Sequence, residues 1–230
     1  QAYKPGTAGV PLPQVNIMII DKSGQELKYN QSGEICYSTP MMMLGYTNNY
    51  EKTKESFFYV GSEKFYKTGD IGFVDEDGFV TYRGRKNDFL FLEDKFGNRI
   101  KQYLFEIEEI VKKYPCIMDC EVVGIDLKND GCKKPVVHIQ FDNDFIENKY
   151  ETLEKIVKDF YNKLPIYCMP VAIKIREDFP VSKSGKRDIK SIEQERTGFI
   201  SIPLNSVGKV DYITLEKEAE KIFREKNKNV

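Results

Sequence analysis

Several features that would point to a common function class are scarce or missing in this chain. The single histidine, His138, lies in an alternating segment typical of a strand, so Ser–His–Asp chemistry has little support. No apolar run approaches the roughly 18–20 residues that a membrane-spanning helix needs. The cysteines are odd in number and lack CxxC spacing, which is typical of free thiols in a reducing cytosol and gives no support for a metal site. They are Cys36, Cys116, Cys120, Cys132 and Cys168.

The chain also lacks an excess of either charge. Its 35 Lys and Arg residues face 36 Asp and Glu residues, giving a net charge of −1. Neither a nucleic acid nor an anionic membrane is therefore expected as the main partner, whereas small ligands and proteins remain open. The 230 residues, 40% of them hydrophobic, suffice for one large or two small folded domains. The N-terminus has neither an initiating Met nor a signal-peptide pattern, which suggests a trimmed or proteolysed chain.

The first part of the chain, residues 3–85, predicts a small β-rich body. Short apolar runs alternate with turn signals, and Asp77-Gly78 between two of these runs predicts a hairpin. A helical turn is expected over Thr53–Phe58, with Thr53 as its cap. The predicted strands are Val15–Ile20, Gly33–Tyr37, Phe73–Val74 and Val80–Tyr82.

Residues 88–197 predict a compact α+β domain with the element order β-α-β-β-α-β. The predicted strands are Phe89–Leu92, Cys120–Ile125, Val136–Phe141 and Val171–Ile175, and the predicted helices are Leu104–Lys113 and Leu153–Tyr161. The fold class is therefore α+β. We expect three parts: residues 1–86, residues 87–197, and a tail over residues 198–230 that ends in a charged helix.

The most informative motif is Tyr66-Lys67-Thr68-Gly69-Asp70, followed by Asp75-Glu76-Asp77-Gly78-Phe79 and Gly84-Arg85-Lys86-Asn87-Asp88. Upstream, Gly9–Pro13, Gly33-Glu34-Ile35 and Gly45-Tyr46 follow in the matching order. Together these motifs resemble the C-terminal part of the adenylate-forming (AMP-binding) superfamily of acyl-CoA synthetases, nonribosomal peptide synthetase adenylation domains and luciferases. The resemblance implies that residues 1–86 complete the large AMP-binding domain and that residues 87–197 form the C-terminal lid.

The resemblance assigns nucleotide contacts to residues of the first part. Asp70, which we expect in a tight turn, matches the aspartate that holds the ribose of ATP or AMP; a carboxylate can accept hydrogen bonds from both ribose hydroxyls. Arg85 matches an arginine that contacts the same nucleotide, and Thr68 is assigned to the same site. Asn87 stands at the family's hinge, usually Asp or Lys, and Asn tolerates unusual backbone angles. Gly97 matches the loop that lines the thiol channel, although this loop is lengthened here.

Two lysines compete for the family's catalytic position. Lys186 follows Tyr167-Cys168-Met169-Pro170 and Pro180 at the family's spacing. Lys209 has similar flanks in Ser206-Val207-Gly208-Lys209. Lys186 is favoured because Lys209 lies beyond the expected end of the domain, and its ammonium would stabilise charge developing at the α-phosphate.

The implied function is ATP-dependent activation of a carboxylic or amino acid as an acyl-AMP, with Mg²⁺ accompanying ATP and CoA or a carrier-protein phosphopantetheine as acceptor. The implied location is the cytoplasm. Nothing resembles the upstream phosphate loop of the family, so the chain alone is expected to be inactive. The alternative is a degenerate, non-catalytic module that recognises a carrier protein or scaffold.

Overall fold

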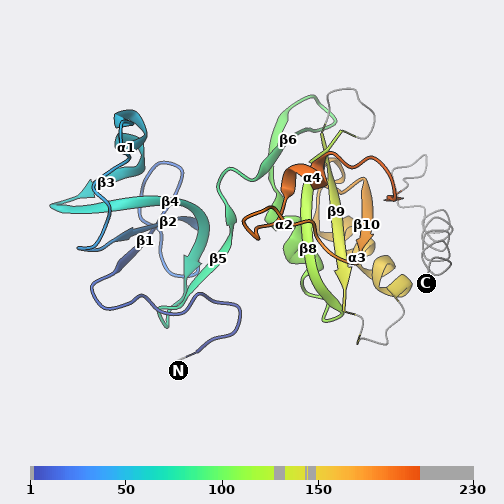
Figure 1. Ribbon diagram of the computed structural model, residues 1–230, viewed down its shortest axis with the longest axis horizontal. Helices are drawn as coiled ribbons and strands as arrows, with labels where there is room; N and C mark the ends of the chain where they lie inside the picture. Colours follow the sequence, from blue (N-terminus) through green and yellow to red (C-terminus); the bar gives the residue numbers. More distant parts are fainter. Residues whose placement is uncertain (1–2, 127–132, 143, 145–148, 203–230) are drawn as a thin grey trace. The chain divides into compact units, whose positions relative to one another are not determined.

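The computed structural model describes residues 3–126, 133–142, 144 and 149–202. It divides into two compact units, Gln1–Asp88 and Phe89–Val230, each considered by itself (Figure 1). Both helices and strands are present, so the predicted α+β class is confirmed. Cys132, Lys209 and the predicted tail helix lie outside the described residues.

The first unit is built on a five-stranded antiparallel sheet. Its strands β1 (Asn16–Ile20), β2 (Gly33–Ser38), β4 (Glu63–Val74) and β3 (Phe57–Val60) lie in that order, and β5 (Val80–Arg85) pairs with β4. Ile20, Cys36 and Phe65 form the buried cluster of this sheet. The predicted Asp-Gly hairpin is confirmed, because Val74 pairs with Val80 and Gly78 has φ +85°.

Two local expectations in this unit are wrong. The helix α1 spans Tyr50–Ser56, and its cap is Asn49, whose side chain accepts a hydrogen bond from the Lys52 N–H. The Thr53 hydroxyl instead donates to the carbonyl of Asn49 and accepts from the Tyr46 N–H. Asp70 lies within the long strand β4 and not in a turn. Gly69, with φ +74°, allows the strand to bulge here and to continue pairing on either side.

The second unit contains a four-stranded sheet and a separate hairpin. The sheet order is β11 (Ile200–Ser201), β10 (Ala172–Arg176), β9 (Lys134–Phe141) and β8 (Ile117–Ile125), with β9 and β10 parallel and the other pairs antiparallel. The hairpin pairs β6 (Phe89–Glu93) with β7 (Arg99–Tyr103). The helices are α2 (Leu104–Val111), α3 (Lys149–Lys163) and α4 (Ile189–Glu193), with a 3₁₀ turn at Ile166–Cys168.

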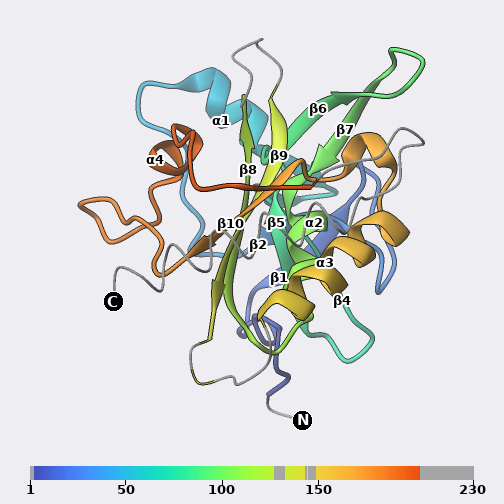
Figure 2. The same ribbon diagram turned by 90° about the vertical axis from the view of Figure 1, so that its right-hand side faces the viewer.

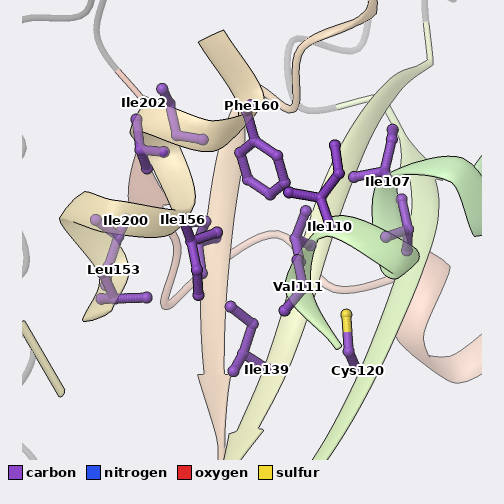
Figure 3. Packing of buried hydrophobic residues seen from close by; sticks show 14 of the residues in the cluster. Ile107, Ile110, Val111, Cys120, Ile139, Leu153, Ile156, Phe160, Ile200 and Ile202 are labelled. Carbon is purple, nitrogen blue, oxygen red and sulfur yellow. The ribbon is translucent and has the colours of Figure 1, made fainter. Parts of the chain in front are cut away.

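Alternate residues of the sheet face two different layers. On one face, Cys120, Val137 and Ile139 pack with side chains of α2 and α3 such as Ile110 and Phe160 (Figure 3). On the other face, a smaller cluster joins Val123, Ile125, Val136 and Ala172 to Ile192 of α4. Figure 2 shows α4 on the side of the sheet opposite α2 and α3. The period-two alternation of these strands therefore builds two cores from one sheet.

The α4 face also carries polar side chains. His138 lies in β9, as its alternating sequence predicts, and is fully buried. Its Nδ1 accepts a hydrogen bond from Arg176 Nε at 2.9 Å, while Phe199 meets its ring edge-on. Burial, reinforced by the positive charge of Arg176, lowers the pKa of His138 from 6.5 to about 3. The imidazole is therefore neutral in the folded protein at physiological pH.

This burial makes the stability of the second unit depend on pH. The unfolded chain protonates its only histidine near pH 6.5, whereas the folded chain does so only near pH 3. The contribution of His138 to the free energy of unfolding is therefore fully present above pH 6.5 and is lost as the pH decreases towards 3. Between pH 7 and pH 5.5 we expect the free energy of unfolding to fall by about 1 kcal/mol more than in a His138→Gln variant. Urea unfolding at both pH values measures the difference, and equal losses in both proteins would contradict it.

The described cysteines, Cys36, Cys116, Cys120 and Cys168, are buried and not disulfide-bonded. No helix in the described part of the chain is long and apolar enough to cross a membrane, and the same residues contain no His, Cys, Asp and Glu group arranged to hold a metal ion.

Candidate functional site

Three of the residues assigned from the sequence come together in the first unit. Asp70 on β4 lies directly opposite Arg85 on β5, and Arg85 Nη1 is 2.6 Å from Asp70 Oδ1. The Thr68 hydroxyl accepts a hydrogen bond from the Asp70 N–H at 2.9 Å and donates to the Ile35 carbonyl at 2.7 Å. The Thr68 hydroxyl thus links the Asp70 backbone to the neighbouring strand β2, and both of these hydrogen bonds are made within the protein.

The Asp70 carboxylate retains capacity to bind a ligand. Its Oδ1 is buried and lies 2.6 Å from Arg85 Nη1, so this oxygen is held in the ion pair. The Asp70 side chain is nevertheless 25% exposed, and that of Arg85 is 58% exposed. A partly open carboxylate beside a guanidinium is suited to a polar, negatively charged ligand that also carries hydroxyl donors.

Glu34 and Lys86, to which the sequence gave no role, fix the end of β5. Glu34 on β2 is only 7% exposed, and its Oε2 receives a hydrogen bond from Lys86 Nζ at 2.7 Å. The Lys86 N–H also donates to the Gly69 carbonyl. The two contacts hold Lys86 against the bulge at Gly69. The sequence signal for this contact was Glu34, a charged residue inside the apolar run of β2. Asn87 follows in an exposed turn between β5 and β6.

The other assigned residues belong to the second unit. Gly97 has φ +81° in the turn between β6 and β7. There, Asp94 Oδ1 accepts hydrogen bonds from the N–H groups of Phe96 and Asn98. Lys186 lies in a tight exposed turn, and none of the residues that the structure describes pairs with its ammonium.

The turn that carries Lys186 is anchored by groups that sequence reasoning missed. Arg187 forms ion pairs with Asp119 and Glu121, which are two residues apart on β8 and therefore on one face of the strand. Burial raises the pKa of Glu121, although the hydrogen bond from Arg187 opposes this effect. Two carboxylates at alternate positions of an otherwise apolar strand were the signal that the face is not simply core.

A second set of ion pairs holds the segment after α4. Glu195 receives hydrogen bonds at 2.6 Å from both Lys174 and Arg176, neighbours on the same face of β10. Burial alone would raise the pKa of Glu195, but these two hydrogen bonds lower it below its ordinary value. The chain on both sides of α4 is therefore tied to the sheet by charge.

Comparisons with known proteins point in one direction. The model of the AMP-binding enzyme family matches residues 1–47. The chain is 26% identical over 196 residues to a long-chain-fatty-acid–CoA ligase of Escherichia coli, an alignment that covers 85% of this chain and 32% of the ligase. It is 29% identical over 194 residues to a D-alanine–D-alanyl carrier protein ligase of Streptococcus pyogenes, covering 81% and 36%.

The fold gives the same result. MatB from Rhodopseudomonas palustris, solved with ATP bound, superposes with a TM-score of 0.61 at 25% identity, covering 83% of this chain and 35% of MatB. The chain thus spans about a third of the length of the curated relatives that it matches. These similarities confirm the resemblance that the sequence motifs predict.

The geometry around Asp70 depends on the absence of a side chain at Gly72. A Cβ atom there would lie 2.1 Å from the Thr81 carbonyl oxygen and 2.7 Å from Ile35 Cδ1. We expect Gly72→Ala to destabilise the first unit by about 1–3 kcal/mol, because β4 and β5 must separate to admit the methyl group. Hydrogen-exchange protection of the β4 and β5 amides measures the loss.

Gly61→Asn is the matched control for this substitution. Gly61 has φ +59°, and a Cβ atom added there would have no heavy atom within 4 Å. Because Asn tolerates this backbone conformation, the control should stay near wild type. Unchanged protection in Gly72→Ala would show that the strands do not pack as described.

Proposed function

We propose, from the relationship of this chain to the adenylate-forming (AMP-binding) enzymes, that it is the C-terminal part of an ATP-dependent ligase that activates a carboxylic acid as an acyl-AMP. The observation that carries the proposal is the Asp70–Arg85 pair. The Asp70 side chain is 25% exposed beside Arg85, and a carboxylate can accept hydrogen bonds from both ribose hydroxyls of ATP. Arg85 would contact the same nucleotide through its planar fork.

The reaction would proceed in two steps. The substrate carboxylate attacks the α-phosphorus of ATP, forming acyl-AMP and releasing pyrophosphate, and a thiol then displaces AMP to give a thioester. Catalysis of the first step consists mainly of positioning and charge stabilisation. Lys186 would stabilise the charge that develops at the α-phosphate. Mg²⁺ would accompany the ATP phosphates, and we assign no residue of the described part to it.

The second step gives roles to Asn87 and Gly97. Asn87, in its exposed turn, would be the hinge about which the lid changes orientation between the steps. Gly97 would line the channel of the thiol. The names of two relatives specify CoA for one and a carrier protein for the other, so the acceptor is either CoA or a carrier-protein phosphopantetheine. The acid is a carboxylic or amino acid.

The first test of this function is nucleotide recognition by Asp70. In an enzyme that contains this chain, ATP–pyrophosphate exchange with a panel of carboxylic acids should identify a substrate. Asp70→Asn should then raise the KM for ATP about 10–100-fold, because charge-assisted hydrogen bonds to the ribose are lost. Asp77→Asn, a 78% exposed aspartate in the following hairpin, should leave the KM within about twofold.

Two outcomes would count against the function. No exchange with any acid would favour the alternative of a non-catalytic module that recognises a carrier protein or scaffold. An unchanged KM in Asp70→Asn would remove the nucleotide assignment. The 230-residue chain alone should show no exchange, since nothing in its sequence resembles the phosphate loop of the family.

The second test concerns the two candidate lysines. Lys186→Ala should lower the rate of acyl-AMP formation about 10²–10³-fold, the loss typical of one donor that stabilises transition-state charge. Lys209→Ala should change the rate by no more than a few fold. Single-turnover formation of acyl-AMP measures both, and the reverse pattern would transfer the catalytic role to Lys209.

A further inference from the structure

We propose that Arg187 is a positioning residue for Lys186, fastening the turn that carries this lysine to two carboxylates of β8. The inference rests on the proposed function, in which Lys186 stabilises the adenylation transition state. Arg187 itself does not touch the reacting atoms. It acts by limiting where the Lys186 ammonium can be.

The turn around Lys186 is closed by backbone hydrogen bonds. The Ser182 N–H donates to the Lys186 carbonyl at 2.6 Å, and the Gly185 N–H donates to the Ser182 carbonyl at 2.9 Å. Val181 and Arg187 form an isolated antiparallel bridge at its base. A loop of this size without further support opens readily, because few buried apolar contacts hold it.

Arg187 supplies that support through its guanidinium. One terminal nitrogen, Nη1, pairs with Glu121, and the other, Nη2, pairs with Asp119. The guanidinium carbon lies 4.2 Å from the centre of the Phe179 ring, just before the turn begins. The Arg187 side chain is only 27% exposed. A planar fork that spans two carboxylates and stacks on a ring fixes both position and orientation, which a lysine cannot do.

The anchor lies next to the reactive group in the chain. Lys186 is exposed and Arg187 is half-buried, so fixing the Arg187 side chain against β8 leaves the neighbouring ammonium free to meet a ligand. On the other side of Arg187, Asp188 caps α4, its Oδ1 accepting from the Ser191 N–H, and its own N–H donates to the Pro180 carbonyl. Lys186 is thus confined by the residues that follow it, whereas its own side chain remains unpaired among the described residues.

The kinetic test uses Arg187→Gln in an enzyme that contains this chain. We expect the single-turnover rate of acyl-AMP formation to fall about 10–100-fold, as for a displaced catalytic group, while the KM for ATP stays within about threefold. Arg187→Lys should show an intermediate loss, because an ammonium cannot span both carboxylates. The matched control is Arg196→Gln, an exposed arginine whose side chain bonds only the backbone carbonyls of Glu193 and Glu195 among the described residues. The control should keep the wild-type rate.

A double variant separates positioning from general stability. If Arg187 acts through Lys186, then Lys186→Ala with Arg187→Gln should be no slower than Lys186→Ala alone, because the group being positioned is already absent. The proposal would be overturned if the rate loss of the double variant were the product of the losses of the two single variants. An unchanged rate in Arg187→Gln would overturn it too. If Arg187→Lys kept the wild-type rate, as the Arg196→Gln control should, the proposal would also be wrong, because a positive charge alone would then be sufficient at this position.

Hydrogen exchange on the 230-residue chain measures the anchoring role of Arg187 without relying on activity, so a failure of this role can be told apart from a failure of the proposed function. Arg187→Gln should lower the protection of the Ser182 and Gly185 amides at least tenfold and leave the β9 amides unchanged. If Lys186→Ala keeps the wild-type rate, the catalytic assignment of Lys186 is wrong and the positioning role is wrong with it, whatever the exchange shows. If Lys186→Ala is slow but the two amides keep their protection in Arg187→Gln, only the anchoring role is wrong.

Discussion

The alternation of side chains across the four-stranded sheet is the constraint on which the second unit depends. Odd and even positions of β8 serve different layers: Cys120 and Val122 enter the core under α2 and α3, whereas Asp119 and Glu121 face α4. The α4 face has an apolar end and a charged end, and buried charges require partners. The segment between β10 and β11 supplies them, with Arg187 for the β8 carboxylates and Glu195 for the basic side chains of β10.

This pairing explains why a segment with little regular structure is held in place. It buries few large apolar side chains besides Ile192 and the partly buried Phe179 and Phe199, so hydrophobic burial holds it at only a few points. Exposed ion pairs contribute little to stability, but these are partly buried, and the Arg187 pair engages two acceptors at once. The same pairs also determine register, since a shift by one residue would place Lys186 opposite the carboxylates in place of Arg187.

The sequence predicted what depends on local patterns. The alternation of Val136–Phe141 and the periodicity of Leu104–Lys113 predicted β9 and α2, and Asp77-Gly78 predicted a hairpin, all confirmed. It did not predict that Gly69 forms a bulge within β4, because a glycine between Thr68 and Asp70 is equally compatible with a turn until the pairing partner is known. The anchor of Arg187 was missed for a similar reason: its partners lie more than 60 residues earlier in the chain.

The two assigned polar residues follow the same local design in both units. Gly69, at φ +74°, precedes Asp70, and Gly185, at φ +75°, precedes Lys186. A positive φ changes the direction of the chain where a residue with a side chain would be strained, so the following residue leaves the regular path of its strand or turn. In each case a nearby arginine then forms an ion pair, Arg85 with Asp70 itself and Arg187 with β8. In both places the glycine changes the direction of the chain and the ion pair of the arginine fixes the segment that follows, so the same two residue types determine the positions of Asp70 and Lys186.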